Sequence, residues 1–164
     1  MNQIDPNEER NKKFAQWSII GAILLAITLV AVPAMKMRRN NRGQLVEVGR
    51  SLYVDHCSQC HGVEGIGQDP KQPRGAKLAS GKYLAPALNE KGGAWFKSNR
   101  ELFDYVKLGS LDAKSPMVGF EEKLTDQQIA STLVYVQSLW PESVMRQHTE
   151  NSPFIPIKSE APGY

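Results

Sequence analysis

Cys57-Ser58-Gln59-Cys60-His61 contains the only two cysteines of the 164-residue chain, with a histidine directly after the second. This spacing is typical of covalent haem attachment: each sulfur can form a thioether to one vinyl group, and the imidazole can reach the iron. A thioredoxin-like redox pair would need a βαβ context, and a zinc site would need a second pair of ligands. The motif therefore predicts one covalent haem c, held by Cys57 and Cys60, with His61 as an axial iron ligand.

The segment before the motif has the pattern of a helix. Over residues 44–56 the apolar side chains recur at helical spacing, at Leu45, Val48, Leu52 and Tyr53. We expect this helix to end at the motif and to lay its apolar face against the haem. Gly49 lies on the same face, and because a glycine lets another backbone come close, it predicts a helix crossing there.

The segment after the motif is rich in Gly and Pro over residues 62–82, which predicts an ordered loop at the haem edge. Next comes Tyr83-Leu-Ala-Pro86-Ala-Leu88. A backbone carbonyl of this region, at Pro86, can accept the free N–H of His61. Such a bond fixes the tautomer of the imidazole and makes it a stronger donor to iron.

Two further helices are predicted downstream. Each begins with a capping box, Ser98-Asn-Arg-Glu101 and Thr125-Asp-Gln-Gln128, and they end at Gly109 and Pro141. We expect the second helix to pack on the Gly49 face of the first through two aromatic residues. These are Tyr135 and Trp140.

Met117 is the candidate for the second axial ligand of the iron. A thioether is a soft ligand that favours Fe(II), so His/Met ligation raises the reduction potential. Met117 follows a stiffening proline in the loop between the two predicted helices, although a methionine can also simply fill a gap in a core. His56 is too close to the attachment site to reach the far face of the haem, and His148 lies in the tail.

These segments together resemble the class I monohaem cytochromes c, in a membrane-anchored bacterial form. The resemblance covers residues 43–142, and Val118-Gly119 stand where many relatives have a proline after the methionine. It implies a small all-α domain around one haem c. It also implies single-electron transfer by a carrier that is not itself an enzyme.

The charge distribution separates the chain into parts. Residues 1–42 carry seven Lys or Arg against three Asp or Glu, whereas residues 43–140 carry eleven of each. A nucleic-acid partner would favour a basic face on the folded domain, which this balance does not provide. We therefore expect no nucleic-acid partner, and the carrier reading implies no small-molecule substrate.

Residues 14–35 form a run without formal charge that is long enough for a helix to cross a bilayer. The predicted order is a polar segment 1–13, a single-pass transmembrane anchor 14–35, a linker 36–42, the cytochrome domain 43–140 and an extended tail 141–164. Two other readings of 14–35 are a cleaved signal peptide, with a cleavage-like site at 32–34, and a buried core helix.

Two signals disagree on orientation. Basic residues are more numerous after the span than before it, which weakly favours a cytoplasmic C-terminal side. In proteins with the haem motif, however, the cofactor is attached after export. We therefore predict an inner-membrane protein with its haem domain on the periplasmic side.

Protein redox partners are expected, within a respiratory or photosynthetic complex. A basic set on the 62–82 loop is either a docking patch for an acidic partner or a solvated surface; it comprises Lys71, Arg74, Lys77 and Lys82. The apolar run 154–157 leads us to expect that the tail lies across a partner subunit. Other readings are a haem protein that binds small molecules or acts as a peroxidase through a labile sixth ligand, and a structural subunit with a vestigial haem.

Overall fold

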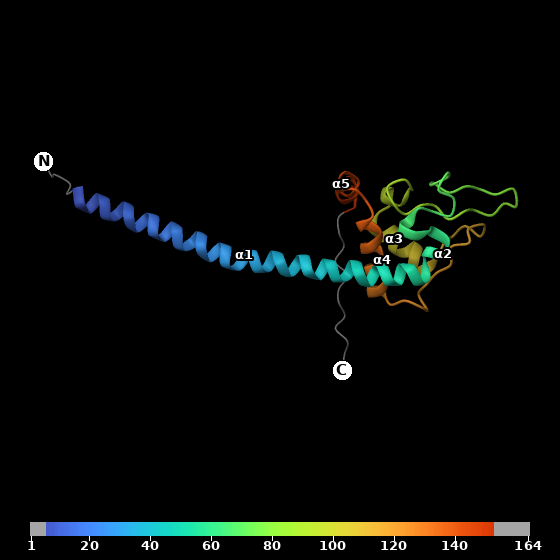
Figure 1. The fold of residues 1–164 in the computed structure, drawn as a ribbon, viewed down its shortest axis with the longest axis horizontal. Helices are drawn as coiled ribbons and strands as arrows, with labels where there is room; N and C mark the ends of the chain where they lie inside the picture. The colour runs from blue at the N-terminus through green and yellow to red at the C-terminus, as the bar shows by residue number, and fades with distance from the viewer. Residues whose placement is uncertain (1–5, 153–164) are drawn as a thin grey trace, which may run out of the picture. The chain divides into compact units, whose positions relative to one another are not determined.

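Helices make up the regular secondary structure of residues 6–152, which is the part of the chain that the computed structural model describes. Within these residues no strand forms, and the only β-type pairings are isolated bridges, Lys77 with Tyr83 and Gly109 with Val118. The all-α class predicted from the sequence is confirmed. In chain order the elements are α1 (Pro6–His56), α2 (Ser58–His61), η1 (Val63–Gly65), η2 (Ala94–Phe96), α3 (Asn99–Leu108), α4 (Asp126–Ser138) and α5 (Glu142–Asn151) (Figure 1).

Helix α1 contains both the apolar run and the helix expected before the motif. The segment predicted to be a linker, residues 36–42, is helical and continues α1. Lys, Arg and Met are good helix formers, and no proline interrupts the segment. The chain nonetheless divides after Arg42 into two compact units, Met1–Arg42 and Gly43–Tyr164.

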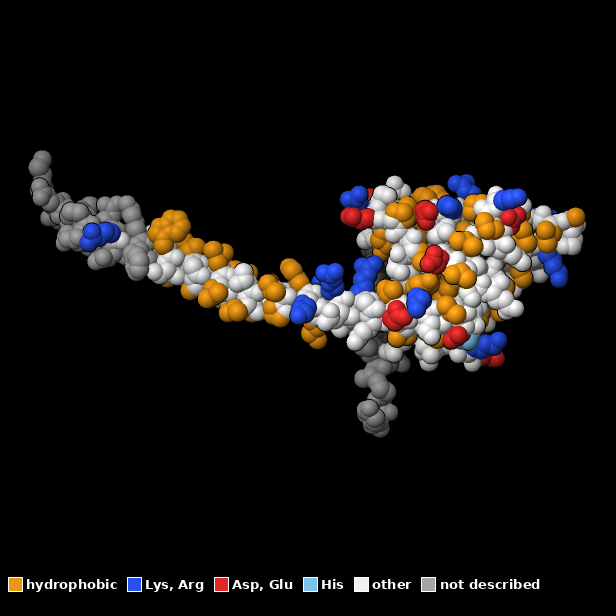
Figure 2. Space-filling model, in the orientation of Figure 1, with side chains coloured by type: hydrophobic (Ala, Val, Ile, Leu, Met, Phe, Trp, Pro, Cys, Tyr) orange, Lys and Arg blue, Asp and Glu red, His pale blue; other side chains and the backbone are white. Residues whose placement is uncertain are grey.

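In the first unit, the apolar part of α1 is long and hydrophobic enough to span a membrane by length and composition. Its large side chains are exposed, as at Leu24, which is 58% exposed, and Val30, which is 71% exposed. Figure 2 shows hydrophobic side chains along this stretch and Lys and Arg side chains at its C-terminal end. Among the residues that the structure describes, this is the one helix that could cross a membrane by length and composition.

In the second unit, Gly49 of α1 is the point where α4 crosses. A Cβ atom added at Gly49 would overlap the carbonyl oxygen of Ser131, so the crossing predicted from this glycine is confirmed. One turn later, the ring of Tyr53 lies 5.2 Å from that of Tyr135. The main core cluster consists of Tyr53, Ala94, Leu102, Tyr135, Val136 and Trp140, and a second one of Phe120, Leu124 and Ile129.

Replacing Gly49 with alanine is expected to destabilise the domain by about 1–3 kcal/mol, because the added methyl group forces the two backbones apart. Denaturant unfolding of the full-length protein in detergent measures this change. Gly43→Ala is the matched control, since a Cβ there meets nothing within 4 Å. The control should be neutral or slightly stabilising, and equal stability of the two variants would contradict the close crossing.

Both predicted capping boxes are confirmed. Ser98 Oγ accepts from the Glu101 N–H at 3.2 Å, and Glu101 Oε2 accepts from the Ser98 N–H at 2.7 Å. Thr125 and Gln128 make the same reciprocal pair at the start of α4. Gly109 ends α3 with a φ of 82°, as expected of a glycine C-cap. Helix α4 is shorter than predicted, so that Trp140 lies just beyond its end.

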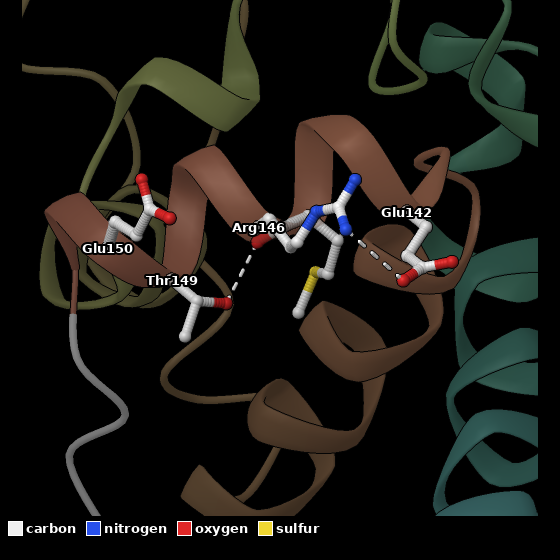
Figure 3. Close-up of a pocket in the computed structure, with 5 residues that line it drawn as sticks. Glu142, Arg146, Thr149 and Glu150 are labelled. Carbon is white, nitrogen blue, oxygen red and sulfur yellow. Dashed lines mark hydrogen bonds and ion pairs between the residues drawn. The ribbon is translucent and has the colours of Figure 1, made fainter.

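Residues 142–151 form helix α5, so the prediction that the whole region 141–164 is extended was wrong. Pro141 stands at its N-cap, and Val144 and Met145 pack against the main core cluster. Figure 3 shows the pocket along α5, where Arg146 Nη1 lies 3.7 Å from Glu142 Oε1. The apolar run 154–157 lies outside the described residues.

A buried histidine fastens α5 to the domain. His148 is 2% exposed, its Nδ1 lies 3.1 Å from the Trp95 carbonyl oxygen, and its Nε2 lies 2.9 Å from Asn99 Oδ1. Ser152 adds a second link, because its hydroxyl oxygen accepts from the Asn99 N–H at 2.7 Å. These contacts join α5 and Ser152 to Trp95 and to the start of α3, so α5 is part of the domain.

Candidate haem site

The two cysteines and His61 lie on one tight turn at the end of α1. The Cys57 N–H donates to the Tyr53 carbonyl at 2.8 Å, and the His61 N–H donates to the Cys57 carbonyl at 2.9 Å. Helical hydrogen bonding therefore continues with little interruption into α2. Residues three and four apart share a face of a helix, so the turn presents all three side chains to one side.

These side chains line a cavity of about 660 Å³, within the usual size of cofactor pockets. All five residues singled out from the sequence line it: Cys57, Cys60, His61, Pro86 and Met117. Apolar walls are added by Leu84, Ala85, Val118 and Phe120. This set suits a haem c: the two thiols can bind its vinyl groups, and its iron accepts the nitrogen of an imidazole and the sulfur of a thioether.

His61 has the tautomer that an iron ligand needs. Its ring is 9% exposed, and Nδ1 lies 2.8 Å from the carbonyl oxygen of Pro86. A carbonyl can only accept, so Nδ1 carries the proton and Nε2 keeps its lone pair. Burial lowers the pKa of His61 and so favours the neutral imidazole, against the opposing effect of the Pro86 hydrogen bond.

Residues 85–89, here termed the proline strap, hold the Pro86 carbonyl in place through backbone hydrogen bonds. The Leu88 N–H donates to the Gly65 carbonyl at 2.8 Å, and the Ala87 N–H donates to the Pro73 carbonyl at 2.8 Å. Gly67, with a φ of 87°, lies so close to Ala87 that a Cβ there would come within 2.8 Å of the Ala87 nitrogen. The Gly-rich loop after the motif therefore packs against the proline strap and holds it through hydrogen bonds.

The acidity of Cys57 argues against a redox pair. Burial, followed by the nearby Cys60, raises the pKa of the Cys57 thiol to about 11. Reactive CxxC thiols and zinc ligands instead need a lowered pKa, because the thiolate is the active form. Before a haem is attached, the Cys57 thiol is therefore protonated near neutral pH, and both cysteines are free of a disulfide.

The Met117 loop is anchored at its base. The Ser110 N–H donates to the Met117 carbonyl at 3.1 Å, next to the bridge between Gly109 and Val118. Met117 is half-buried and packs on the Phe120 cluster. His56 also lines the cavity, and its ring lies 6.0 Å from that of Phe120. His148 does not line the cavity, because it lies on α5 and contacts Trp95 and Asn99.

Several residues of the cavity had no signal in the sequence. Lys123 is one of them. It lines the cavity beside Arg74 and Lys77, which belong to the predicted basic set. Tyr83 also lines it, with Lys77 Nζ 6.0 Å from the ring centre. Which residues of an irregular loop turn inward depends on the path of the loop, and no periodic pattern records that path.

A helical domain that presents CxxCH, a carbonyl-bound imidazole and a thioether to one cavity belongs to the class of covalent haem proteins. Residues 46–140 match the family model of cytochrome c. The match covers more than half of the chain, so this chain belongs to the cytochrome c family and carries a covalently attached haem c. Comparison with curated proteins and with solved structures finds no match. Helix α5 lies outside the matched region.

Proposed function

We propose that this protein transfers single electrons through a haem c ligated by His61 and Met117. The family supports haem-based electron transfer. The observation that carries the proposed ligand pair is that His61 and Met117 line the same cavity as the two cysteines. In this proposal the chain is a membrane-tethered carrier, or a cytochrome subunit, of a respiratory or photosynthetic complex.

The bound haem supplies the one-electron chemistry, and the residues of the chain tune and shield it. Pro86 orients His61 and strengthens it as a donor, and Met117 supplies the softer ligand that raises the potential. Phe120 and Leu84 help to keep water from the cavity. No general acid or base is needed, since no proton has to move in the reaction.

The ligand pair is tested on the full-length protein. The oxidised form is expected to show the thioether-to-iron charge-transfer band at the red edge of the spectrum, and the reduced form to bind carbon monoxide only slowly. A missing band with rapid carbon monoxide binding would contradict the proposal and favour a small-molecule haem protein. A haem that stays oxidised while the parent complex turns over would favour a structural subunit.

The membrane tether is proposed from the exposed apolar run of α1 and its basic flanks. We place the span in the inner membrane and the haem domain on the periplasmic side, because covalent haem attachment follows export. Mass spectrometry of the mature protein tests the anchor, since retention of residues 1–35 distinguishes an anchor from a signal peptide. Protease protection in spheroplasts tests the periplasmic location: external protease should remove the haem domain.

The partner is proposed to be an acidic redox protein that docks at the cavity edge, where Arg74 and Lys77 lie. Attraction between exposed charges is screened by salt, so the electron-transfer rate should fall as ionic strength rises. Lys77→Gln is expected to slow the reaction by about two- to fivefold at low salt, the size of one surface charge pair.

Stopped-flow measurements with the native partner check the Lys77 prediction. Lys91→Gln is the control, since Lys91 is equally exposed and does not line the cavity. A rate that is independent of ionic strength in the wild-type protein would remove the docking patch.

The C-terminal residues are proposed to contact a partner subunit. Because α5 is part of the domain, the informative deletion is 153–164, which leaves the His148 network intact. Loss of co-purification of the partner would support this interaction, and unchanged co-purification would refute it.

A further inference from the structure

The proline strap is held by a side chain that does not line the haem cavity. Trp140 donates its indole Nε1–H to the Leu88 carbonyl at 2.7 Å. On the opposite side of this residue, the Leu88 N–H donates to the Gly65 carbonyl. Leu88 is two residues from Pro86, whose carbonyl accepts from His61. The position of that carbonyl therefore depends in part on how Leu88 is fixed, beside the bond from the Ala87 N–H to the Pro73 carbonyl.

Trp140 is itself immobilised. It is 6% exposed, and its ring meets that of His148 at 4.9 Å with an interplanar angle of 67°. His148 is fixed in turn by the Trp95 carbonyl and by Asn99. A part of the chain outside the cytochrome c match thus packs directly on the residue that clamps the strap.

We propose that Trp140, braced by α5, is a positioning residue for the axial ligand His61. The contacts run from His148 to Trp140, from Trp140 to Leu88, and from the strap to the His61 ring. Loss of the indole N–H leaves the Leu88 carbonyl unpaired and loosens the strap. The bond from His61 Nδ1–H to Pro86 then weakens, the imidazole becomes a poorer donor, and Fe(III) is stabilised less. The reduction potential rises as a result. This inference rests on His61 as the axial ligand of the proposed function.

The test is Trp140→Phe in the full-length haem protein, which keeps an aromatic ring and removes only the donor. In the reduced protein, NMR should show that the His61 Nδ1 proton exchanges with solvent about tenfold faster, the effect of one lost hydrogen bond. The reduction potential should rise, while the thioether charge-transfer band stays. If the exchange rate of the His61 Nδ1 proton and the reduction potential of this variant equal those of the wild-type protein, the proposal is overturned, even if the variant is less stable.

Trp95→Phe is the matched control. Its indole Nε1–H also donates to a backbone carbonyl, that of Glu90 at 3.2 Å, but this acceptor lies beyond the strap. The control should leave His61 exchange and the potential unchanged, and an equal effect in both variants overturns the specific role of Trp140. Absence of the thioether band in the wild-type protein would instead contradict Met117 as ligand.

A measurement on the wild-type protein decides the question if Trp140→Phe fails to take up haem. After division by the intrinsic exchange rates of the two groups, the Trp140 indole proton and the His61 Nδ1 proton should show the same protection factor and the same denaturant dependence, because one opening exposes both. A protection factor of the Trp140 proton about tenfold lower than that of the His61 proton would show that the strap stays closed without the clamp, and would overturn the proposal.

Discussion

Met117→Leu is expected to lower the reduction potential of the haem by on the order of 0.1–0.3 V, a fraction of the ~0.8 V range that axial ligands set. Leucine nearly matches methionine in volume, so packing on the Phe120 cluster persists while the sulfur is lost. The thioether charge-transfer band should disappear, and carbon monoxide should bind the reduced iron rapidly. Redox titration and carbon monoxide mixing on the full-length protein measure these changes.

Met145→Leu separates ligation from packing. Met145 is also partly buried, but it packs on the main core cluster from α5 and does not line the haem cavity. Its replacement should leave the spectrum and the potential unchanged. If Met117→Leu also retained the band, the sixth ligand would have to be another residue, and His56 would be the next to test because it lines the cavity.

The double variant Cys57→Ala/Cys60→Ala is expected to lose all covalently bound haem, because the chain has no other thiol to form a thioether. Each single variant should keep one thioether and a lower yield of haem protein. The unfilled cavity of about 660 Å³ should also make the double variant much less stable, because its apolar walls lose their packing partner. Haem staining after denaturing electrophoresis, together with intact mass, measures attachment.

Ser58→Ala controls for disturbance of the turn itself. Ser58 lies between the cysteines in sequence, and its hydroxyl donates to the Val54 carbonyl at 2.7 Å, so its loss perturbs the same turn without removing sulfur. This variant should retain full haem attachment. Haem that remained covalently bound in the double cysteine variant would show that the attachment chemistry is different.

The features that were predicted correctly from the sequence depend on few residues, which lie close together in the chain. The capping boxes at Ser98 and Thr125 are local hydrogen-bond patterns, so the starts of α3 and α4 could be predicted to the residue. Gly49 marked a helix crossing because close backbone approach excludes a side chain. The CxxCH motif places its chemistry on consecutive residues and needs no knowledge of the fold.

The features that were missed depend on distant partners. Helix α5 has polar residues and no side-chain cap. It is fixed by contacts of His148 to Asn99 and Trp95, which lie 49 and 53 positions earlier in the chain. The polar sequence of the predicted linker 36–42 did not indicate its helical conformation, because helix propensity and two flanking helical stretches decide it. The clamp from Trp140 to Leu88 likewise joins residues 52 positions apart, and no local pattern predicts such a pair.

The proline strap has a consequence for the rate of electron exchange. Its hydrogen bonds to Gly65, Pro73 and Trp140 fix the dipole of the Pro86 carbonyl before any change of charge at the iron. In the proposed function, a preorganised dipole would not have to reorient when an electron arrives or leaves, so the reorganisation energy that it contributes would be small. A low reorganisation energy lets electrons pass quickly between centres of nearly equal potential, in either direction.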